Sequence, residues 1–199
     1  MRIGVLALQG AFREHAGALR DLGADPVEVR RPEDLDGLDG LIIPGGESTT
    51  IRMLMRELGL EEALRDRIAA GFPVLGTCAG LIVLADRVDG VPVDGLDALG
   101  ADVRRNAFGR QVDSFEEELV VPPLGADPVR GVFIRAPVVD SVDENVDVLA
   151  RLHDGRIVGV RQGAVVGLAF HPELTEDRRL HRYFLDLVRA RELVPSSGG

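Results

Sequence analysis

The chain contains one cysteine, and its neighbours suit a nucleophile. Cys78 lies in the sequence GTCAG, between Gly76 and Gly80, where an apolar run meets the start of an expected helix. Two glycines permit a sharp strand-to-helix turn that exposes the sulfur. The N–H groups at the start of the helix favour a thiolate, and that of Ala79 can donate to an oxyanion. The alternative is a buried structural cysteine.

A thiol nucleophile needs a base, and His171 is the best placed of the four histidines. It follows the apolar run AVVGLAF, at the carboxyl end of an expected buried strand, where open α/β sheets place their sites. The next residue is Pro172, which favours an extended segment in which Glu173 faces the same way as His171. Cys78, His171 and Glu173 would then be nucleophile, base and orienting carboxylate for acyl transfer through a thioester. His15 and His181 fall inside amphipathic helices, where packing or surface roles are expected.

A third segment, PGGEST at residues 44–49, ends another expected strand on the same rim. Its glycines allow close approach of the backbone to a ligand, and its N–H groups could help to form an oxyanion pocket. By itself the segment could also be a tight turn with Ser48 or Thr49 as a helix N-cap.

The elements that position these residues alternate in the first half of the chain. Apolar runs predict strands in IGVLAL, PVEVR, GLIIPGG and PVLGTC, with helices at 11–23, between 49 and 70 with a break near Gly59, and from about Ala79. This order predicts an α/β fold with a mostly parallel central sheet between two layers of helices. The region from about 89 to 162 favours antiparallel strands, and a last helix is expected after Thr175 as its N-cap. We expect one domain over 1–194 and a frayed tail at 195–199.

Composition narrows the function further. The net charge of −10 and the lack of clustered cations argue against nucleic acid as a partner. The apolar runs are too short to cross a membrane, and the lone cysteine fits a reducing cytoplasm. All 23 cationic residues are arginine, so the chain can form no lysine Schiff base and no lysine-containing P-loop. We expect no metal and no cofactor.

Six segments together resemble one family: LQGAFREH, IIPGGESTT, GTCAGLIVLA, RNAFGRQVDSF, VFIRAP and HPELTED. They are similar to the glutaminase subunit of pyridoxal 5′-phosphate synthase, within the class I, triad-type glutamine amidotransferases. The cysteine and His-Pro-Glu motifs are shared by the whole class, whereas RNAFGRQVDSF and FIRAP are specific to the family. The resemblance extends from Ile3 to Asp177.

The resemblance implies the class I glutamine amidotransferase fold and the hydrolysis of L-glutamine to glutamate and ammonia. Ammonia would pass to a separate synthase subunit within a large hetero-oligomer. The family's substrate contacts correspond here to Gly46, Glu47, Ser48, Arg105, Ile134 and Arg135. The oxyanion donors would be the N–H groups of Ala79 and Gly46.

Three alternatives remain. Another triad glutaminase, feeding a different ammonia-channelling synthase, would keep the triad but should lack FGRQVDSF and FIRAP. A non-catalytic regulatory subunit could retain the fold, although an intact triad argues against it. The His-Pro-Glu segment argues against a cysteine-elbow hydrolase or chaperone of a related class.

Overall fold

The structure is a computed structural model that describes residues 1–109 and 114–192. Part of RNAFGRQVDSF, the boundary at residue 194 and the tail at 195–199 therefore lie outside the described residues. One domain over 1–194 stays a prediction.

A parallel set of strands forms one half of the main sheet, in the order β2-β1-β3-β4-β13. Each of the central strands is a short apolar run that is buried on both faces, as parallel strands between helical layers must be. The bounds are Arg2–Leu6 for β1, Asp25–Val29 for β2, Gly40–Ile43 for β3, Val74–Thr77 for β4 and Val165–Leu168 for β13.

The other half of the sheet is built mainly from antiparallel pairs and continues in the order β13-β12-β10-β7-β5-β6, with β11 beside β12. An exception is the pair β5 and β7, which is parallel. The bounds are Ala85–Val88 for β5, Val91–Pro92 for β6, Leu99–Arg104 for β7, Val138–Val142 for β10, Asp147–Arg151 for β11 and Ile157–Gln162 for β12. A separate antiparallel hairpin consists of β8 (Ser114–Leu119) and β9 (Val129–Ile134).

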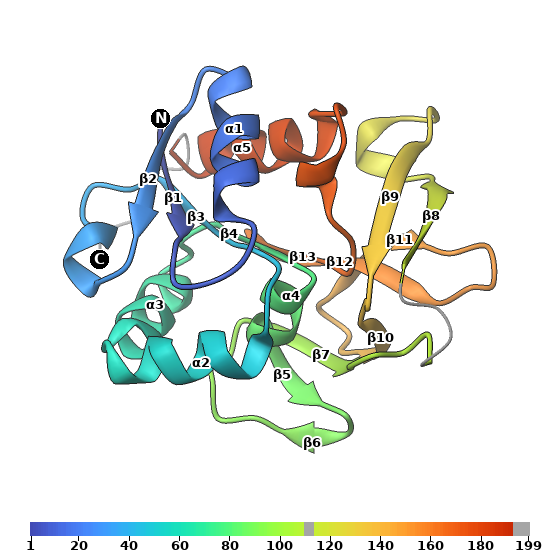
Figure 1. Cartoon of the computed structure of the whole chain (residues 1–199), viewed down its shortest axis with the longest axis horizontal. Coiled ribbons are helices and arrows are strands. Elements are labelled where there is room, and N and C mark those ends of the chain that lie inside the picture. The colour runs from blue at the N-terminus through green and yellow to red at the C-terminus, as the bar shows by residue number, and fades with distance from the viewer. Residues whose placement is uncertain (110–113, 193–199) are drawn as a thin grey trace.

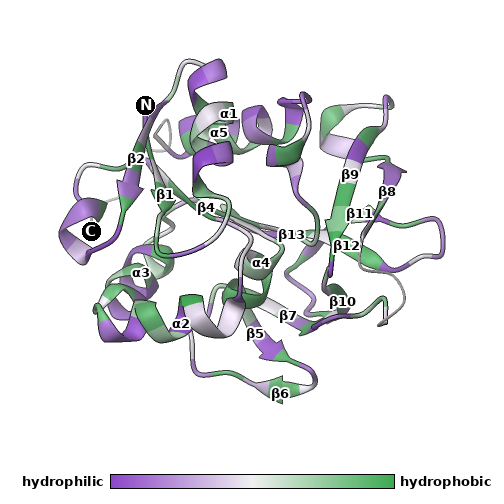
Figure 2. Ribbon diagram, viewed as in Figure 1, coloured by the Kyte–Doolittle hydropathy of each residue, from purple (hydrophilic) through white to green (hydrophobic). Residues whose placement is uncertain are grey.

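Helices cover both faces of the parallel half, which gives three layers (Figure 1). One face carries α1 (Phe12–Asp21) and α5 (Arg179–Glu192), and the other carries α2 (Ser48–Glu57), α3 (Leu60–Ala69) and α4 (Ala79–Leu84). Short 3-10 turns occur at η1 (Pro32–Leu35), η2 (Pro122–Leu124) and η3 (Pro172–Leu174). The predicted fold class is confirmed. The apolar strands of the sheet lie between the helical layers (Figure 2), and no helix in the described ranges is long and apolar enough to span a membrane.

The predicted start of the last helix is wrong. Helix α5 begins at Arg179, and its first turn contains no acidic residue. Thr175 instead ends the preceding 3-10 turn, where its hydroxyl accepts a hydrogen bond from the N–H of Asp177 at 3.3 Å. Asp177 in turn accepts from the N–H of Arg179 at 2.9 Å. Residues 176–178, which sequence alone places in the helix, instead form an irregular connection between the 3-10 turn and α5.

Candidate active site

Cys78 occupies a strained turn between β4 and α4. Its φ is +50°, a conformation that L-residues other than glycine rarely adopt. Its backbone N–H donates to the carbonyl of Leu168 at 2.7 Å, so the neighbouring strand holds the turn in place. The sulfur lies 3.9 Å from the carbonyl oxygen of Ile134, at the end of β9. The turn therefore aims the thiol toward the hairpin rather than into the core.

The two glycines around Cys78 are required by close packing of the backbone. A Cβ at Gly80 would lie 2.0 Å from the carbonyl oxygen of Ile43, and one at Gly76 would lie 2.6 Å from the backbone of Gly80. Neither neighbour can move as a flexible side chain could. The G-x-C-x-G spacing thus lets β3, β4 and α4 approach one another behind the cysteine.

His171 and Glu173 meet at the carboxyl end of β13. The ring Nδ1 of His171 lies 2.7 Å from Oε1 of Glu173, and both side chains are buried. The backbone N–H of His171 donates to the carbonyl of Val132 in β9 at 2.9 Å. The expected extended segment is wrong, because residues 172–174 form the 3-10 turn η3 with Pro172 in its first position. This turn nevertheless brings the carboxylate to the ring.

Electrostatics favour a cationic His171 beside the sulfur. Burial alone lowers the pKa of His171, but hydrogen bonds to Cys78 and Glu173 outweigh it and raise the pKa to about 10. Burial has the opposite effect on an acid and raises the pKa of the Glu173 carboxyl. The neighbouring His15 and His171 outweigh this effect and hold the pKa of Glu173 below its usual range. A protonated imidazole between a sulfur and a carboxylate is the arrangement that activates a cysteine nucleophile.

The loop after β3 packs against both the base and the loop after β1. A Cβ at Gly45 would lie 2.4 Å from Cε1 of His171 and 3.4 Å from Cβ of Cys78. The carbonyl of Gly45 accepts from the N–H of Ala11 at 3.2 Å. Glycine is needed here so that the loop backbone can lie directly beside the two reactive side chains.

The expected cap of α2 is wrong. The N-cap is Glu47, whose carboxylate accepts from the N–H groups of Thr49 at 3.3 Å and Thr50 at 2.8 Å. These hydrogen bonds, chiefly that from Thr50, hold the pKa of Glu47 below its usual range. The N–H of Glu47 donates to the side chain of Gln9 at 2.7 Å. The longer carboxylate of Glu47 therefore satisfies the helix N-terminus that sequence analysis gave to Ser48 or Thr49.

A cavity of about 510 Å³ opens above Cys78 and His171. The cavity is lined by every residue expected from the sequence to contact the substrate, namely Gly46, Glu47, Ser48, Arg105, Ile134 and Arg135, and by the oxyanion candidate Ala79. Six further residues line the cavity that were not predicted from the sequence: Gln9, Gly10, Ala11, Ile82, Asn106 and Leu174. The position of Gln9 and Gly10 directly after the first buried strand was the signal that could have found them, since the carboxyl ends of parallel strands share one rim.

The two candidate arginines differ in their surroundings. Arg105 donates from Nε to Asp89 at 2.7 Å and from its backbone N–H to the same carboxylate at 2.9 Å. Among the ion pairs of the described residues, none within 4.0 Å involves the guanidinium of Arg135. Asp89 thus fixes Arg105 at the rim, whereas Arg135 offers its charge to the cavity.

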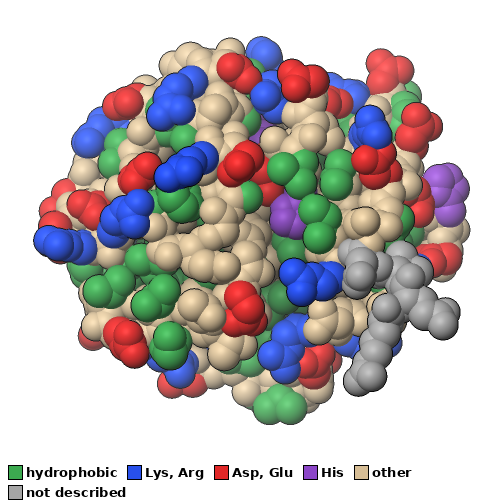
Figure 3. Space-filling model, viewed as in Figure 1, with side chains coloured by type: hydrophobic (Ala, Val, Ile, Leu, Met, Phe, Trp, Pro, Cys, Tyr) green, Lys and Arg blue, Asp and Glu red, His purple; other side chains and the backbone are tan. Residues whose placement is uncertain are grey.

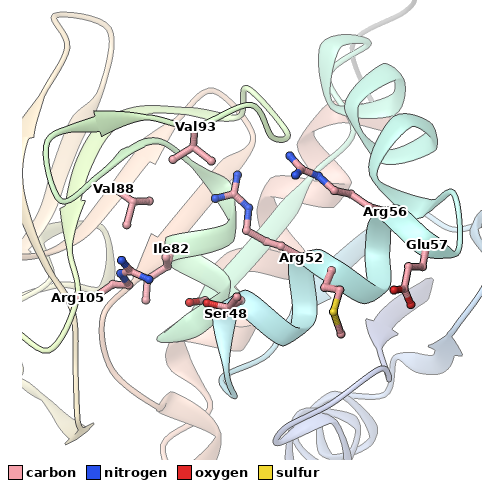
Figure 4. A pocket seen from close by; sticks show the side chains of 10 residues that line it. Ser48, Arg52, Arg56, Glu57, Ile82, Val88, Val93 and Arg105 are labelled. Atoms are coloured by element: carbon pink, nitrogen blue, oxygen red, sulfur yellow. The ribbon is translucent and has the colours of Figure 1, made fainter.

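A second cavity, of about 430 Å³, adjoins the first and shares Ser48, Ile82 and Arg105 with it (Figure 4). Arg52 and Arg56 of α2 line it, and Arg56 is paired with Glu61 at 2.9 Å. No cluster of histidine, cysteine or carboxylate side chains within residues 1–109 and 114–192 could hold a metal ion. Figure 3 shows acidic and arginine side chains interspersed over the face in view, with no single cationic surface there.

Comparison with known structures gives the class of the protein. The fold superposes on a crystal structure of a glutamine amidotransferase with a TM-score of 0.88 and 57% identity, covering 94% of this chain and 98% of that one. It also superposes on the structure of PurLQS from Thermotoga maritima with a TM-score of 0.65 at 20% identity, covering 93% of this chain and 97% of that one, which supports the fold alone.

The family follows from the sequence comparison. The model of the SNO glutamine amidotransferase family matches residues 5–190, and this chain belongs to that family. Two of its relatives are pyridoxal 5′-phosphate synthase subunits PdxT. The one from Kineococcus radiotolerans is 58% identical and covers 95% of each chain, and the one from Acidothermus cellulolyticus is 56% identical and covers 97% of this chain and 96% of its own. The resemblance inferred from the motifs is confirmed.

Proposed function

We propose that this chain hydrolyses L-glutamine to L-glutamate and ammonia as the glutaminase subunit of pyridoxal 5′-phosphate synthase. The observation that carries the proposal is the meeting of Cys78 with a buried His171–Glu173 pair at the floor of a cavity. The names of the close relatives support the particular synthase.

The reaction proceeds by two acyl transfers. The sulfur of Cys78 attacks the side-chain amide carbon of glutamine, and the carbonyl electron pair moves onto the oxygen, which accepts from the N–H groups of Ala79 and Gly46. The imidazolium of His171 gives its proton to the amide nitrogen, so ammonia leaves and a thioester forms. His171 then takes a proton from water, the hydroxide attacks the thioester, and the sulfur leaves to restore Cys78. Glu173 fixes the tautomer of His171 and balances its charge throughout.

The rest of the cavity would select the substrate. A guanidinium is the apt partner for the α-carboxylate of glutamine, because it presents paired N–H donors and a permanent charge. Arg105 and Arg135 both line the cavity and would share this role. Gly46, Glu47, Ser48 and Ile134 would contact the remainder of the amino acid.

The absence of lysine from the sequence implies a division of labour. Ring assembly from a pentose phosphate and a triose phosphate calls for imine chemistry, which a lysine-free chain cannot supply through a lysine. A synthase subunit in a hetero-oligomer would perform that step with the ammonia released here. We place this complex in the cytoplasm, in keeping with a chain whose one cysteine is the nucleophile.

The decisive experiment measures glutamate release from L-glutamine by the purified chain, with and without the synthase subunit, beside Cys78→Ala. We expect activity that rises strongly with the partner and is abolished in the variant. Equal activity with and without the partner would show that the synthase subunit does not activate glutamine hydrolysis. No activity in either condition would favour a regulatory subunit that keeps the fold.

A further inference from the structure

Two buried histidines lie behind the triad and have no part in the mechanism above. His15 of α1 and His181 of α5 are both 0% exposed, as is Thr77, the last residue of β4. Helices α1 and α5 lie on the same face of the sheet (Figure 1), and α1 packs against η3, the turn that contains Glu173. Uncharged packing residues would fill this space at lower cost, so two imidazoles here call for an explanation.

The histidines form a continuous polar chain that ends on Glu173. Nδ1 of His15 lies 3.0 Å from Nε2 of His181. Nε2 of His15 lies 3.0 Å from the hydroxyl oxygen of Thr77 and 3.4 Å from Oε2 of Glu173. The other carboxylate oxygen, Oε1, is the one that contacts His171. The two oxygens of Glu173 therefore face two different histidines.

One set of tautomers favours the charge on Glu173. A carboxylate can only accept, so a proton on Nε2 of His15, which faces Glu173 and Thr77, stabilises it, whereas a lone pair on Nε2 would repel it. Burial lowers the pKa of His15, so the ring is neutral and its Nδ1 is an acceptor. His181 must then donate from Nε2. Burial also lowers the pKa of His181 to about 3, which leaves its Nδ1 unprotonated, and among the described residues that atom has no hydrogen-bond partner.

The second oxygen of Glu173 needs such a donor. Oε2 is buried and has no hydrogen bond from any described residue, because Nε2 of His15, although 3.4 Å away, is directed at the Thr77 hydroxyl instead. Because both acceptors lie near the same Nε2, a rotation of the His15 ring would turn its N–H from the Thr77 hydroxyl toward Oε2. Because His15 is neutral, it can hold the carboxylate without cancelling the negative charge that His171 requires.

We propose that His15 is a positioning residue of the glutaminase reaction, which holds the second oxygen of Glu173 through its Nε2–H while His181 fixes the tautomer of His15. The proposal rests on the proposed function, because it concerns the same triad. It extends the three-residue triad into a buried chain of five side chains that runs from Cys78 to helix α5.

The test compares His15→Leu, which removes the donor, with His15→Gln, whose side-chain amide N–H reaches the place of Nε2. Each variant is assayed for glutamate release in the complex with the synthase subunit, as kcat and KM across pH. His153→Leu is the matched control, because His153 is exposed and pairs only with Glu117 among the described residues. The other charged groups near the chain, Glu14 beside His15 and Arg178 beside His181, are unchanged in all three.

We expect His15→Leu to lower kcat by about 10- to 100-fold, as loss of an outer-shell partner does elsewhere, with KM within about twofold. The acid limb of kcat should move up by about one pH unit, because Glu173 loses a donor that favours its charged form. His15→Gln should restore kcat to within about threefold of the parent and return the acid limb. A full kcat in His15→Leu, or an equal loss in both variants without a change in the acid limb, contradicts the proposal.

A second measurement applies if His15→Leu does not fold. The ¹⁵N spectrum of the histidine-labelled parent should show His15 neutral with its proton on Nε2, and His181 likewise. A proton on Nδ1 of His15 overturns the proposal. This result needs no turnover, so a chain that hydrolyses no glutamine but shows these tautomers would refute the proposed function alone.

Discussion

At the scale of single residues, the backbone around Cys78 explains why glycine occupies both flanking positions. Gly80 approaches the carbonyl of Ile43 so closely that any side chain must displace backbone rather than another side chain. The cost of a substitution should therefore be large even for one methyl group, and it should fall on the geometry of the nucleophile.

We expect Gly80→Ala to lower the free energy of unfolding by about 2–4 kcal/mol and to reduce glutaminase activity in parallel. Gly17→Ala is the control, since Gly17 lies inside α1 with nothing within 4 Å of an added Cβ. It should raise stability by about 0.5–1 kcal/mol, as alanine does in a helix. Urea unfolding followed by circular dichroism measures the stability of both variants, and glutamate release measures their activity. Equal effects of the two substitutions would contradict the role given to the close approach.

The charge state of His171 belongs to the same scale. Of the interactions that raise its pKa to about 10, the hydrogen bond to Cys78 is the largest. Cys78→Ala should therefore lower the pKa of His171, which NMR titration of its ring protons can follow. The signal is assigned by its loss in His171→Gln. A pKa that stays near 10 without the sulfur would mean that Glu173 alone maintains the charge.

At the scale of elements, the hairpin β8–β9 forms one wall of the site and is fixed to the sheet by aromatic packing. Phe133 of β9 stacks on Phe115 of β8 with ring centroids 4.5 Å apart, and it contacts Phe170 at 5.5 Å. Its strand neighbours Val132 and Ile134 supply the carbonyls that face His171 and Cys78. The position of the hairpin therefore bears on the triad directly.

Phe133→Ala should cost about 3–5 kcal/mol of stability, as removal of a fully buried aromatic side chain does. It should also lower kcat in the folded protein, because the carbonyls of β9 would no longer be held against the triad. Val120→Ala is the control, since Val120 directly follows β8 but is exposed, and it should change stability by less than about 0.5 kcal/mol. Thermal unfolding and glutamate release test both. An unchanged kcat at a temperature where Phe133→Ala is folded would separate the hairpin from the chemistry.

At the scale of the whole molecule, neutral histidines buried between α1, α5 and the sheet make folding sensitive to acid. The pKa of His181 is about 3 in the native state, against its ordinary value of 6.5 in an unfolded chain. Between pH 6.5 and 3, His181 is therefore protonated in the unfolded chain but neutral in the native protein. Stability from this group is present above pH 6.5 and is lost as the pH falls toward 3.

His181→Phe should reduce the dependence of unfolding free energy on pH by about 1.4 kcal/mol per pH unit between pH 4 and 6. Urea unfolding at intervals across this range gives the slope, which does not depend on any constant cost of the substitution. Parallel slopes for the parent and the variant would show that His181 does not resist protonation.

The sequence by itself determined the chemistry of this protein and the strands that carry it. Buried parallel strands must be apolar, and ligand loops must follow their carboxyl ends, so Cys78, His171 and the loop at 44–48 could be placed on one rim without coordinates. The need for glycine on both sides of Cys78 could be predicted equally well, because few other residues are tolerated in such a strained turn. The substrate-contacting residues came from family motifs rather than from any local pattern.

Only the tertiary structure decided which of several local options each polar group takes. Glu47 rather than Ser48 or Thr49 caps α2, and α5 begins at Arg179 rather than directly after Thr175, because alternative hydrogen bonds at a helix start differ little in free energy. The proposed role of His15 and His181 could not be predicted from the sequence for a different reason. Their partners lie 62 to 166 residues away in the chain, and burial of an imidazole is decided by packing between helices that no local pattern encodes.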